Sequence, residues 1–309
     1  MVVAAAGARG RRTGASAAIT RQARRRRVGA TVLTLPSWAL LAGLFAVPIG
    51  VGFYLSFRND AIGSAVPARF VGFENYRRDV VDTKFVESLR TTASVAVLGL
   101  LLQIPVGVGL ALVLHRNLRG SRLFRSALLV PMLLTPVGVA LMWRFMLDTD
   151  LGVVNWLLHS VGLSRIGWLG EQRAALVSVV LVDSWQAVPF VMLLTLAGLA
   201  GLPESPLEAA FVDGASPWQT FWFVTLPMLR PVLYVAVMIR VIDAIKLFDV
   251  IFILTRGGPG TATQTSGLLA YNTGFNFLQT GRAAAIGAVL TLLTLPVYVL
   301  WVRASRAGR

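Results

Sequence analysis

The 309-residue chain has no cysteine, only two lysines among its 29 basic residues, and charged side chains at just 14% of positions. The absence of cysteine excludes disulfides, thiolate metal sites and a cysteine nucleophile. A soluble domain usually has about 25% charged and about 45–50% apolar residues, whereas 56% of this chain is hydrophobic. This balance excludes an ordinary cytosolic enzyme and also excludes disorder. We expect one polytopic membrane domain.

Sequence signatures of catalysis are also missing. A phosphate-binding P-loop needs a Gly-Lys-Ser/Thr sequence, and the two lysines, Lys84 and Lys246, follow threonine and isoleucine. No Gly-x-Ser-x-Gly elbow occurs. The two histidines, His115 and His159, lack the spacing of metal ligands. We therefore predict that the chain is not an enzyme and binds neither metal nor cofactor. Any energy source must come from another polypeptide.

The net charge of +15 could suggest a nucleic-acid-binding protein, but the placement of the arginines argues against it. Eight arginines lie within residues 1–27, and most of the others stand in short gaps between apolar runs. Positive residues at the ends of apolar runs are typical of the cytoplasmic side of membrane proteins. We expect contacts with membrane lipid and none with nucleic acid.

Apolar runs predict an all-α membrane domain over residues 28–302 with six transmembrane helices, because about 20 apolar residues cross a bilayer. The expected helices cover about residues 28–57, 91–114, 126–143, 174–200, 232–254 and 283–302. The first run is too long for a signal peptide and has no small-x-small cleavage site after it, so we interpret it as a retained helix.

The distribution of charge predicts the topology. Loop 115–125 and tail 303–309 contain arginines and no acid, which places them, with the Arg-rich tail 1–27, in the cytoplasm. Both termini are then cytoplasmic. Loop 201–230 should also be cytoplasmic, yet it has three acidic residues and only Arg230. This exception needs another explanation.

Local signals divide this loop into two short helices. Ser205 with Glu208, and Ser216 with Gln219, each fit a capping box with proline at the first helical position. Gly214 stands where the first helix should end. The loop is strongly apolar for a segment outside the bilayer, so we expect it to contact a partner.

The same loop resembles the EAA loop of ABC importer permeases. Glu208-Ala209-Ala210-x-x-x-Gly214 is followed after nine residues by Val224-Thr225-Leu226-Pro227, with Val224 in place of the usual Ile. The resemblance implies a type I ABC importer permease fold and a loop that docks on a cytoplasmic ATPase subunit. The implied docking residues are Glu208, Ala209, Ala210, Gly214, Leu226 and Pro227. Helix capping alone would also account for Glu208 and Gly214.

A second stretch resembles carbohydrate ABC permeases, specifically the first of their two paired subunits. It covers residues 248–260, Phe-Asp-Val-Ile-Phe-Ile-Leu-Thr-Arg-Gly-Gly-Pro-Gly. The resemblance implies uptake of a sugar or oligosaccharide across a bacterial inner or plasma membrane. The implied partners are a second permease in a heterodimer, two copies of an ATPase that hold ATP and Mg, and an extracellular or periplasmic sugar-binding protein.

Charged residues inside predicted helices cost about 2.5–3.5 kcal/mol each at the bilayer centre, so they should face the bundle interior. In the fifth helix Arg240, Asp243, Lys246 and Asp249 follow one another at i, i+3 spacing with alternating sign, so that each offsets its neighbour. The candidates for a sugar path are Asp183, Trp185, Gln186, Asp243 and Lys246. Structural pairing is the alternative.

Three other functions remain open. The same machinery could carry glycerol phosphate, a polyamine or an amino acid. A membrane-embedded enzyme would need a catalytic constellation, and none is visible. A secondary transporter driven by an ion gradient would need neither an ATPase nor an EAA-like loop.

Overall fold

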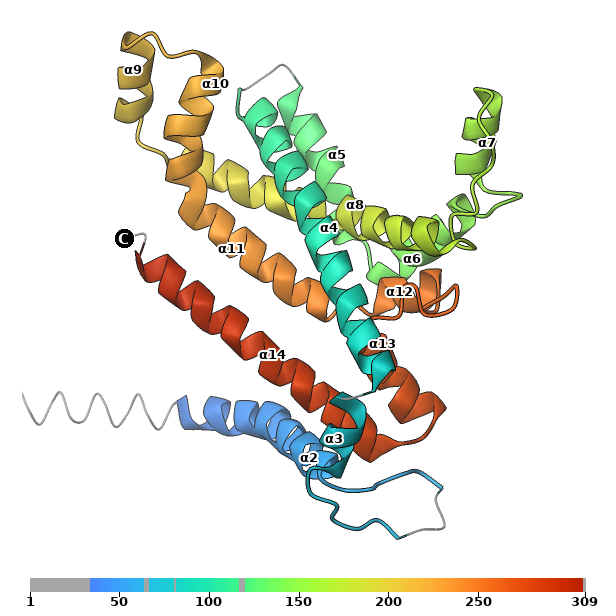
Figure 1. Cartoon of the computed structure of the whole chain (residues 1–309). Coiled ribbons are helices and arrows are strands. Elements are labelled where there is room, and N and C mark those ends of the chain that lie inside the picture. Colours follow the sequence, from blue (N-terminus) through green and yellow to red (C-terminus); the bar gives the residue numbers. More distant parts are fainter. Residues whose placement is uncertain (1–33, 64–66, 81, 117–119, 308–309) are drawn as a thin grey trace, which may run out of the picture. The chain divides into compact units, whose positions relative to one another are not determined.

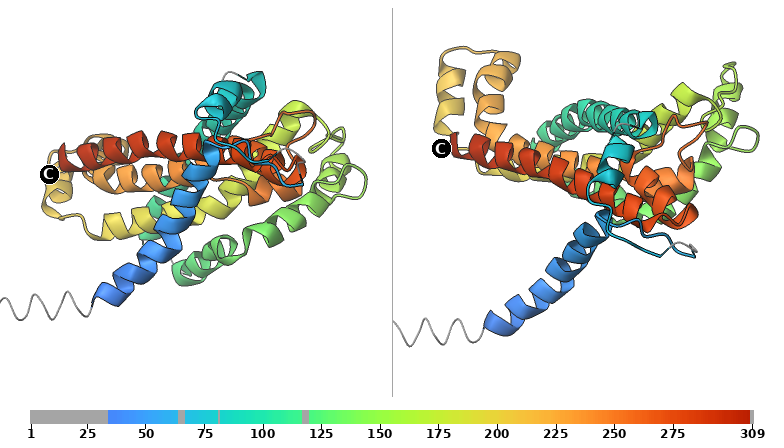
Figure 2. Two further views of the ribbon diagram at one scale, coloured as in Figure 1. Left: turned by 90° about the horizontal axis from the view of Figure 1, so that it is seen from below. Right: turned by 60° about the horizontal axis from the view of Figure 1, so that its bottom comes forward.

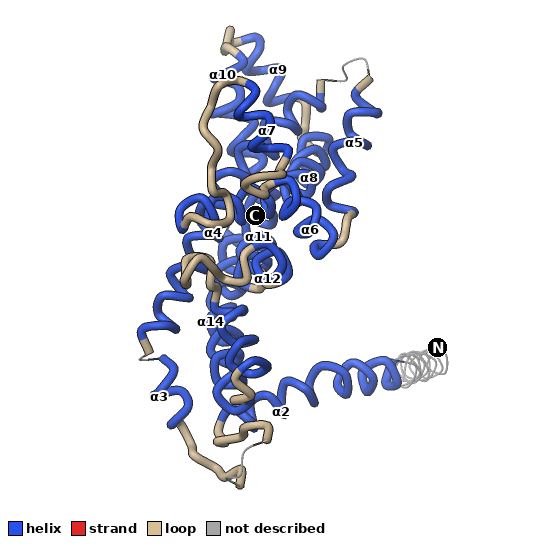
Figure 3. The backbone as a smooth tube through the Cα atoms, turned by 90° about the vertical axis from the view of Figure 1, so that its right-hand side faces the viewer, coloured by secondary structure: helices blue, strands red, loops and turns tan. Residues whose placement is uncertain are grey.

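The computed structural model describes residues 34–63, 67–80, 82–116 and 120–307, and these residues form helices joined by loops (Figures 1 and 3). The described part contains no named strand, and its one isolated bridge joins Arg58 to Phe70. The Arg-rich tail 1–27 and the beginning of the first predicted helix, residues 28–33, lie outside the described residues. The chain divides into two compact units, one ending at Tyr54 and one beginning at Leu55.

The described residues of the first unit belong to one apolar helix, whose last two residues are in the second unit. It begins at Thr34, contains a π-helical stretch at Ala42–Ala46 (η1), and continues through α2 at Val47–Ser56. This helix is long and apolar enough to cross a membrane, as predicted for residues 28–57.

In the second unit, two further helices coincide with predicted spans. The 33-residue α4 covers Thr83–His115, and the 29-residue α8 covers Gln172–Ala200. Both have the length and composition of membrane-spanning helices. The predicted last helix, 283–302, lies inside the longer α14 at Thr280–Ala307, of which the stretch Thr280–Pro296 is apolar.

The predicted helix 126–143 is two helices rather than one. α5 at Ser121–Leu133 and α6 at Pro136–Met146 are bent from each other by 98°. Pro136 disfavours helical backbone at the residue before it, and both Leu134 and Thr135 are extended. Hydropathy measures only the length of an apolar run, so it could not show this bend.

The predicted helix 232–254 begins and ends earlier than expected. α10 at Pro217–Thr220, a π-helical turn η2 at Phe221–Thr225 and α11 at Leu226–Ile245 form one continuous 29-residue helix. The wide π turn ends two residues before Pro227, whose ring would otherwise crowd the carbonyl four residues earlier. The last six predicted residues form a separate short helix, α12 at Asp249–Leu254.

The remaining helices are short. They are α3 at Glu74–Val80, α7 at Val153–Ser160, α9 at Ser205–Val212, α13 at Ser266–Tyr271 and the π-helical η3 at Asn272–Asn276. At one end of the unit an ion pair between Asp79 and Arg282 joins α3 to α14. α14 also runs beside α11, and its last turns lie at the end of α11 that carries α9 and α10 (Figure 2).

The core of the second unit is built around α8. On one half of this helix Val179 and Val182 pack with α12 and α6, through residues such as Ile251 and Val139. On its other half Met192 and Leu199 pack with the ends of α4 and α11. α4 and α8 approach closely at Gly107, where an added Cβ would lie 2.6 Å from Cγ1 of Val191. Small residues permit such close helix contacts in membranes.

This close approach predicts different effects of alanine at two glycines of α4, Gly107 at the contact with α8 and Gly109 on an open face. Gly107→Ala should destabilise the protein by about 1–3 kcal/mol, because it overpacks the α4–α8 contact. The matched control is Gly109→Ala, since an added Cβ there meets nothing within 4 Å. Thermal unfolding of the purified chain in detergent measures both effects. Equal unfolding midpoints for the two variants would contradict this packing.

Candidate functional site

The loop between α8 and α11 forms an elbow, which we define as residues 204–220. Its first arm is α9 and its second arm is α10, and Gly214 between them has φ +74°. Glycine adopts this left-handed conformation without steric cost. The capping box predicted at Ser216 is confirmed: its hydroxyl accepts the backbone N–H of Gln219 at 3.3 Å, and the Gln219 side chain accepts the N–H of Ser216 at 2.8 Å.

The other predicted capping box, Ser205 with Glu208, is wrong. Helix α9 begins at Ser205, and the residue at its N-cap is Glu204, which makes no side-chain capping bond. The N–H of Glu208 donates to the backbone carbonyl of Glu204 at 3.0 Å. Helix capping therefore does not account for the side chain of Glu208, which is exposed.

The elbow carries an exposed surface of apolar side chains around this carboxylate. The side chains of Phe211 and Val212 are each 83% exposed, and Trp218 on the other arm is 70% exposed. Among the residues implied for docking, Glu208, Ala209 and Gly214 lie exposed on the elbow. Ala210 is turned inward and buried. Leu226 and Pro227 are half-buried in the first turn of α11.

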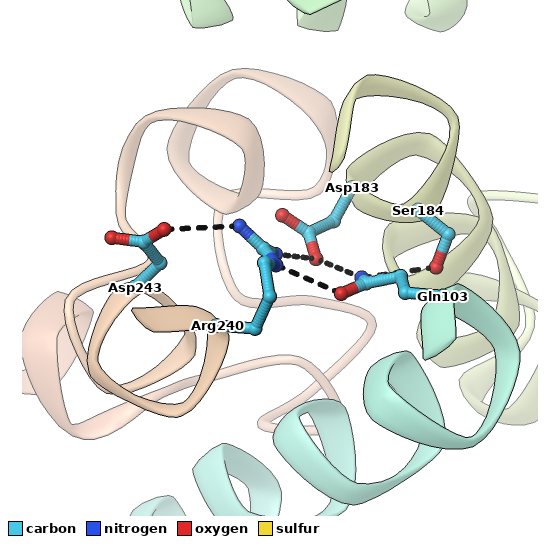
Figure 4. A network of polar contacts seen from close by, with 5 residues as sticks. All are labelled: Gln103, Asp183, Ser184, Arg240 and Asp243. Atoms are coloured by element: carbon cyan, nitrogen blue, oxygen red, sulfur yellow. Dashed lines mark hydrogen bonds and ion pairs between the residues drawn. The ribbon is translucent and has the colours of Figure 1, made fainter. Parts of the chain in front are cut away.

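A second polar site lies inside the helix bundle, where three helices contribute to one hydrogen-bonded network (Figure 4). Arg240 of α11 donates from Nη2 to Asp183 Oδ2 of α8 at 2.8 Å and from Nε to Gln103 Oε1 of α4 at 2.8 Å. Gln103 also donates from Nε2 to Asp183 Oδ2 at 2.8 Å and to the Ser184 hydroxyl at 3.2 Å. Each of the three helices is therefore bonded to the other two.

Burial makes this network different from a surface ion pair. Arg240 and Asp183 are each 8% exposed and Gln103 is 1% exposed. A charge in this environment is stable only when it is paired and hydrogen-bonded. Arg240 has a second carboxylate nearby, Asp243 Oδ2 at 3.2 Å from Nη1, but the side chain of Asp243 is half exposed. The network thus extends from the interior to an accessible carboxylate.

The structure brings together only some of the predicted intramembrane groups. Of the expected pairs at i, i+3 spacing, it forms Arg240–Asp243. Lys246 has no ion pair among the described residues, because α11 ends at Ile245 and Lys246 is its C-cap. The amide of Gln186 donates to the Leu134 carbonyl at 2.8 Å, at the bend between α5 and α6.

Two tryptophans pack together between α6 and α8. The Trp185 ring meets Trp143 edge to face, with centroids 5.7 Å apart.

The sequence patterns did not predict Gln103 as a member of the buried network. Its side chain is the sole amide in the apolar run 91–114, and this could have indicated it.

The loop after α6 is held by a buried asparagine. Asn155 donates to the carbonyls of Thr149 and Ile166, and its Oδ1 accepts the indole N–H of Trp168 at 3.0 Å. In the same loop the backbone N–H groups of Leu151 and Asp150 donate to Asp148 and lower the pKa of its carboxyl. The loop is therefore an ordered structure outside the apolar helices.

These features define an integral membrane protein whose helix bundle carries a structured elbow between its helices. The chain belongs to the family of binding-protein-dependent transport system inner membrane components, whose sequence profile matches residues 103–306. It is thus a multi-pass membrane component of a transport system and not an enzyme, as predicted.

Relatives of this family match nearly the whole chain. It is 34% identical to the trehalose/maltose transport system permease protein MalF of Thermococcus litoralis, over 90% of this chain and 94% of that protein. It is 33% identical to the trehalose transport system permease protein SugA of Mycobacterium tuberculosis, over 84% and 83% of the two chains.

The fold is also found in a solved structure. A crystal structure of a bacterial ABC transporter that imports the acidic polysaccharide alginate matches with a TM-score of 0.79 at 22% identity. The match covers 94% of this chain and 98% of that chain. The predicted all-α type I ABC importer permease fold is confirmed.

The buried network predicts that substitutions of two aspartates lower the free energy of unfolding by very different amounts. Asp183→Leu should lower the free energy of unfolding by at least about 2 kcal/mol, because it leaves Arg240 without its buried partner. The matched control Asp243→Leu should cost less than about 1 kcal/mol, since that pair is half exposed. Denaturant unfolding in detergent measures both.

A double variant tests the pairing itself. Asp183→Leu combined with Arg240→Met should recover most of the lost stability, because an apolar pair replaces an ion pair without leaving an isolated charge. Additive losses in the double variant would show that the two side chains do not act as a pair.

Proposed function

We propose that this chain is the permease subunit of an ATP-driven ABC importer that takes up a sugar or oligosaccharide. The observation that carries the proposal is the similarity, over most of the chain, to permeases named for trehalose/maltose and for trehalose transport. A further relative, 32% identical over 91% of this chain, is named a sulfoquinovosyl glycerol transport system permease of Agrobacterium fabrum. The three names share a carbohydrate group.

In this proposal the elbow docks on a cytoplasmic ATPase. The exposed carboxylate of Glu208 would pair with a basic group of the ATPase, and the exposed apolar side chains of Phe211 and Val212 would be covered by it. Two copies of the ATPase supply ATP and Mg, and a second, related permease completes a heterodimer. A substrate-binding protein delivers the sugar from the opposite side of the membrane.

The continuous helix that starts at Pro217 supports a mechanical link from the elbow to the network. From Pro217 to Arg240 it is about 35 Å long at 1.5 Å per residue. A displacement of the elbow moves this helix as a unit, and Arg240 passes the displacement to α8 and α4. Alternating access then follows, because the two paired helix bundles change their orientation relative to each other and open the central path to one side of the membrane at a time.

The polar residues near Arg240 are the proposed sugar path. Sugar hydroxyls bond to carboxylates, amides and ammonium groups, and sugar C–H faces pack on aromatic rings. Asp243 and Lys246 are exposed and offer such groups, with Trp185 and Gln186 on α8. Asp183 contributes mainly by holding Arg240.

We further propose that both termini lie in the cytoplasm of a bacterium, with the protein in its inner or plasma membrane. In support, His115 and Arg116 line a cavity together with Leu207 and Phe211 of the elbow. The Arg-rich loop 115–125 therefore begins beside the segment proposed to meet the ATPase, and arginine-rich loops favour the cytoplasmic side.

The docking role of Glu208 can be tested on the assembled transporter. Glu208→Ala should reduce sugar uptake by at least about tenfold, since a charge-assisted bond contributes about 1.5–3 kcal/mol. The matched control is Glu204→Ala, which removes an exposed carboxylate one turn earlier. Uptake into proteoliposomes and co-purification of the ATPase are the measurements. If both variants transport at the wild-type rate, the elbow does not couple through Glu208.

The sugar path predicts an effect of Asp243 on transport without an effect on assembly. Asp243→Asn should weaken uptake by about tenfold, because a neutral amide bonds sugar hydroxyls less strongly than a carboxylate does. The control is Glu87→Gln, which neutralises an exposed carboxylate on a different helix, α4. Unchanged uptake by Asp243→Asn with intact assembly would remove this residue from the path.

The class of solute is tested separately on the companion binding protein. Its binding of sugars should be saturable and should not be displaced by glycerol phosphate, polyamines or amino acids. Displacement by one of these compounds would assign the importer to that solute instead.

A further inference from the structure

An apolar groove runs along the half of α4 that ends beside the elbow. Its cavity has a volume of about 560 Å³ and lies between α4 and the helix formed by α10, η2 and α11. We name it the α4–α11 groove. Its α4 wall consists of Ile104, Pro105, Val108, Gly109, Leu112 and Arg116, and its other wall includes Trp218, Phe221, Trp222, Leu226 and Leu233.

We infer that this groove binds one anionic phospholipid of the cytoplasmic leaflet, with its phosphate at Arg116 and an acyl chain along α4. The first support is the length of the groove. From Ile104 to Arg116 it extends about 18 Å along the helix, which is close to the roughly 15 Å depth of one leaflet of a 30 Å hydrocarbon core.

Charge complementarity selects the headgroup. Arg116 is exposed at the end of the groove and also lines a second cavity of about 450 Å³ beside the elbow. Neither cavity is lined by an acidic residue, and loop 115–125 contains none. Basic pockets between membrane helices on the cytoplasmic side bind anionic headgroups. A zwitterionic lipid also has a phosphate, but its ammonium group would add a second positive charge near Arg116, which an anionic lipid does not.

Two exposed tryptophans lie at the depth in the membrane where the headgroup is proposed to bind. Trp218 and Trp222 stand edge to face with ring centroids 5.6 Å apart, and both are exposed. Tryptophan gathers where hydrocarbon meets headgroups. These rings lie on the groove wall near Arg116, so they belong at the depth where an acyl chain joins its glycerol.

The floor of the groove has space for a chain. Gly109 lies on it, and a Cβ added there would meet nothing within 4 Å. Two residues earlier, Gly107 faces the tight contact with α8 instead. The open glycine therefore faces the groove, and a larger side chain at this position would fill it without disturbing the helix packing.

The test is native mass spectrometry of the full-length chain, purified together with the subunits that accompany it and incubated with phosphatidylglycerol or phosphatidylcholine. The wild type should retain one phosphatidylglycerol per chain in preference to phosphatidylcholine. Arg116→Gln should reduce this retention about fivefold, because a basic residue near a membrane surface contributes about 1 kcal/mol. Gly109→Leu should abolish it by occupying the path of the acyl chain.

Two control variants separate binding from general damage. Arg90→Gln removes an exposed arginine near the other end of α4, and Gly287→Leu adds a side chain at another helical glycine with open space. Both should retain phosphatidylglycerol as the wild type does. Equal retention of the two lipids by the wild type, or of phosphatidylglycerol by all four variants, would overturn the proposal.

Photocrosslinking identifies the occupant directly. A Gly109→Cys variant labelled with a photoactivatable group should crosslink to phosphatidylglycerol in membranes. A crosslink only to another polypeptide would show that a partner subunit fills the groove, and this would also overturn the lipid assignment.

Discussion

The buried Arg240 is the constraint on which the bundle depends. A guanidinium at this depth must have a carboxylate and further acceptors, and Asp183 and Gln103 supply them from two other helices. The positions of α4, α8 and α11 are therefore fixed by directional bonds as well as by packing. Apolar contacts between helices in a membrane lack the hydrophobic drive that they have in water. The polar network consequently specifies which helices meet, and the small residue at the α4–α8 crossing lets them approach closely enough for it to form.

This constraint also connects the two candidate sites. The second arm of the elbow, α10, belongs to the same continuous helix as Arg240, so the position of this arm relative to the network is set by the geometry of one helix rather than by a loose linker. The exposed side chains of the elbow and the half-exposed carboxylate of Asp243 lie at the two ends of this element. A stiff helix of this kind can transmit a displacement from a segment outside the bilayer to polar groups inside it.

The sequence patterns predicted the helices well wherever a run was long and uniformly apolar, as in α4 and α8. They failed where the backbone changes direction inside a predicted span: Pro136 begins a new helix after a bend, and α11 ends at Ile245 although the predicted span continues to residue 254. Local signals predict the aromatic segment 218–223 as part of a short helix separate from the fifth span, whereas the structure makes it continuous with α11. For the site, spacing along one helix identified Arg240–Asp243. It could not identify Asp183 or Gln103 as partners, because contacts between helices leave no periodic signal.

The π-helical turn at Phe221–Thr225 gives the nine-residue spacing between Gly214 and the Val-Thr-Leu-Pro sequence a geometric meaning. Each residue of an α-helix advances the side-chain direction by about 100°. Inserting or deleting a single residue between the elbow and Pro227 would thus rotate Glu208 by more than a quarter turn about the axis of the helix, relative to Arg240. The length of this segment would change by only about 1.5 Å. The fixed spacing in this stretch therefore preserves the azimuth of the elbow, which is its rotational orientation about the axis of the helix. It has much less effect on the distance between the elbow and Arg240.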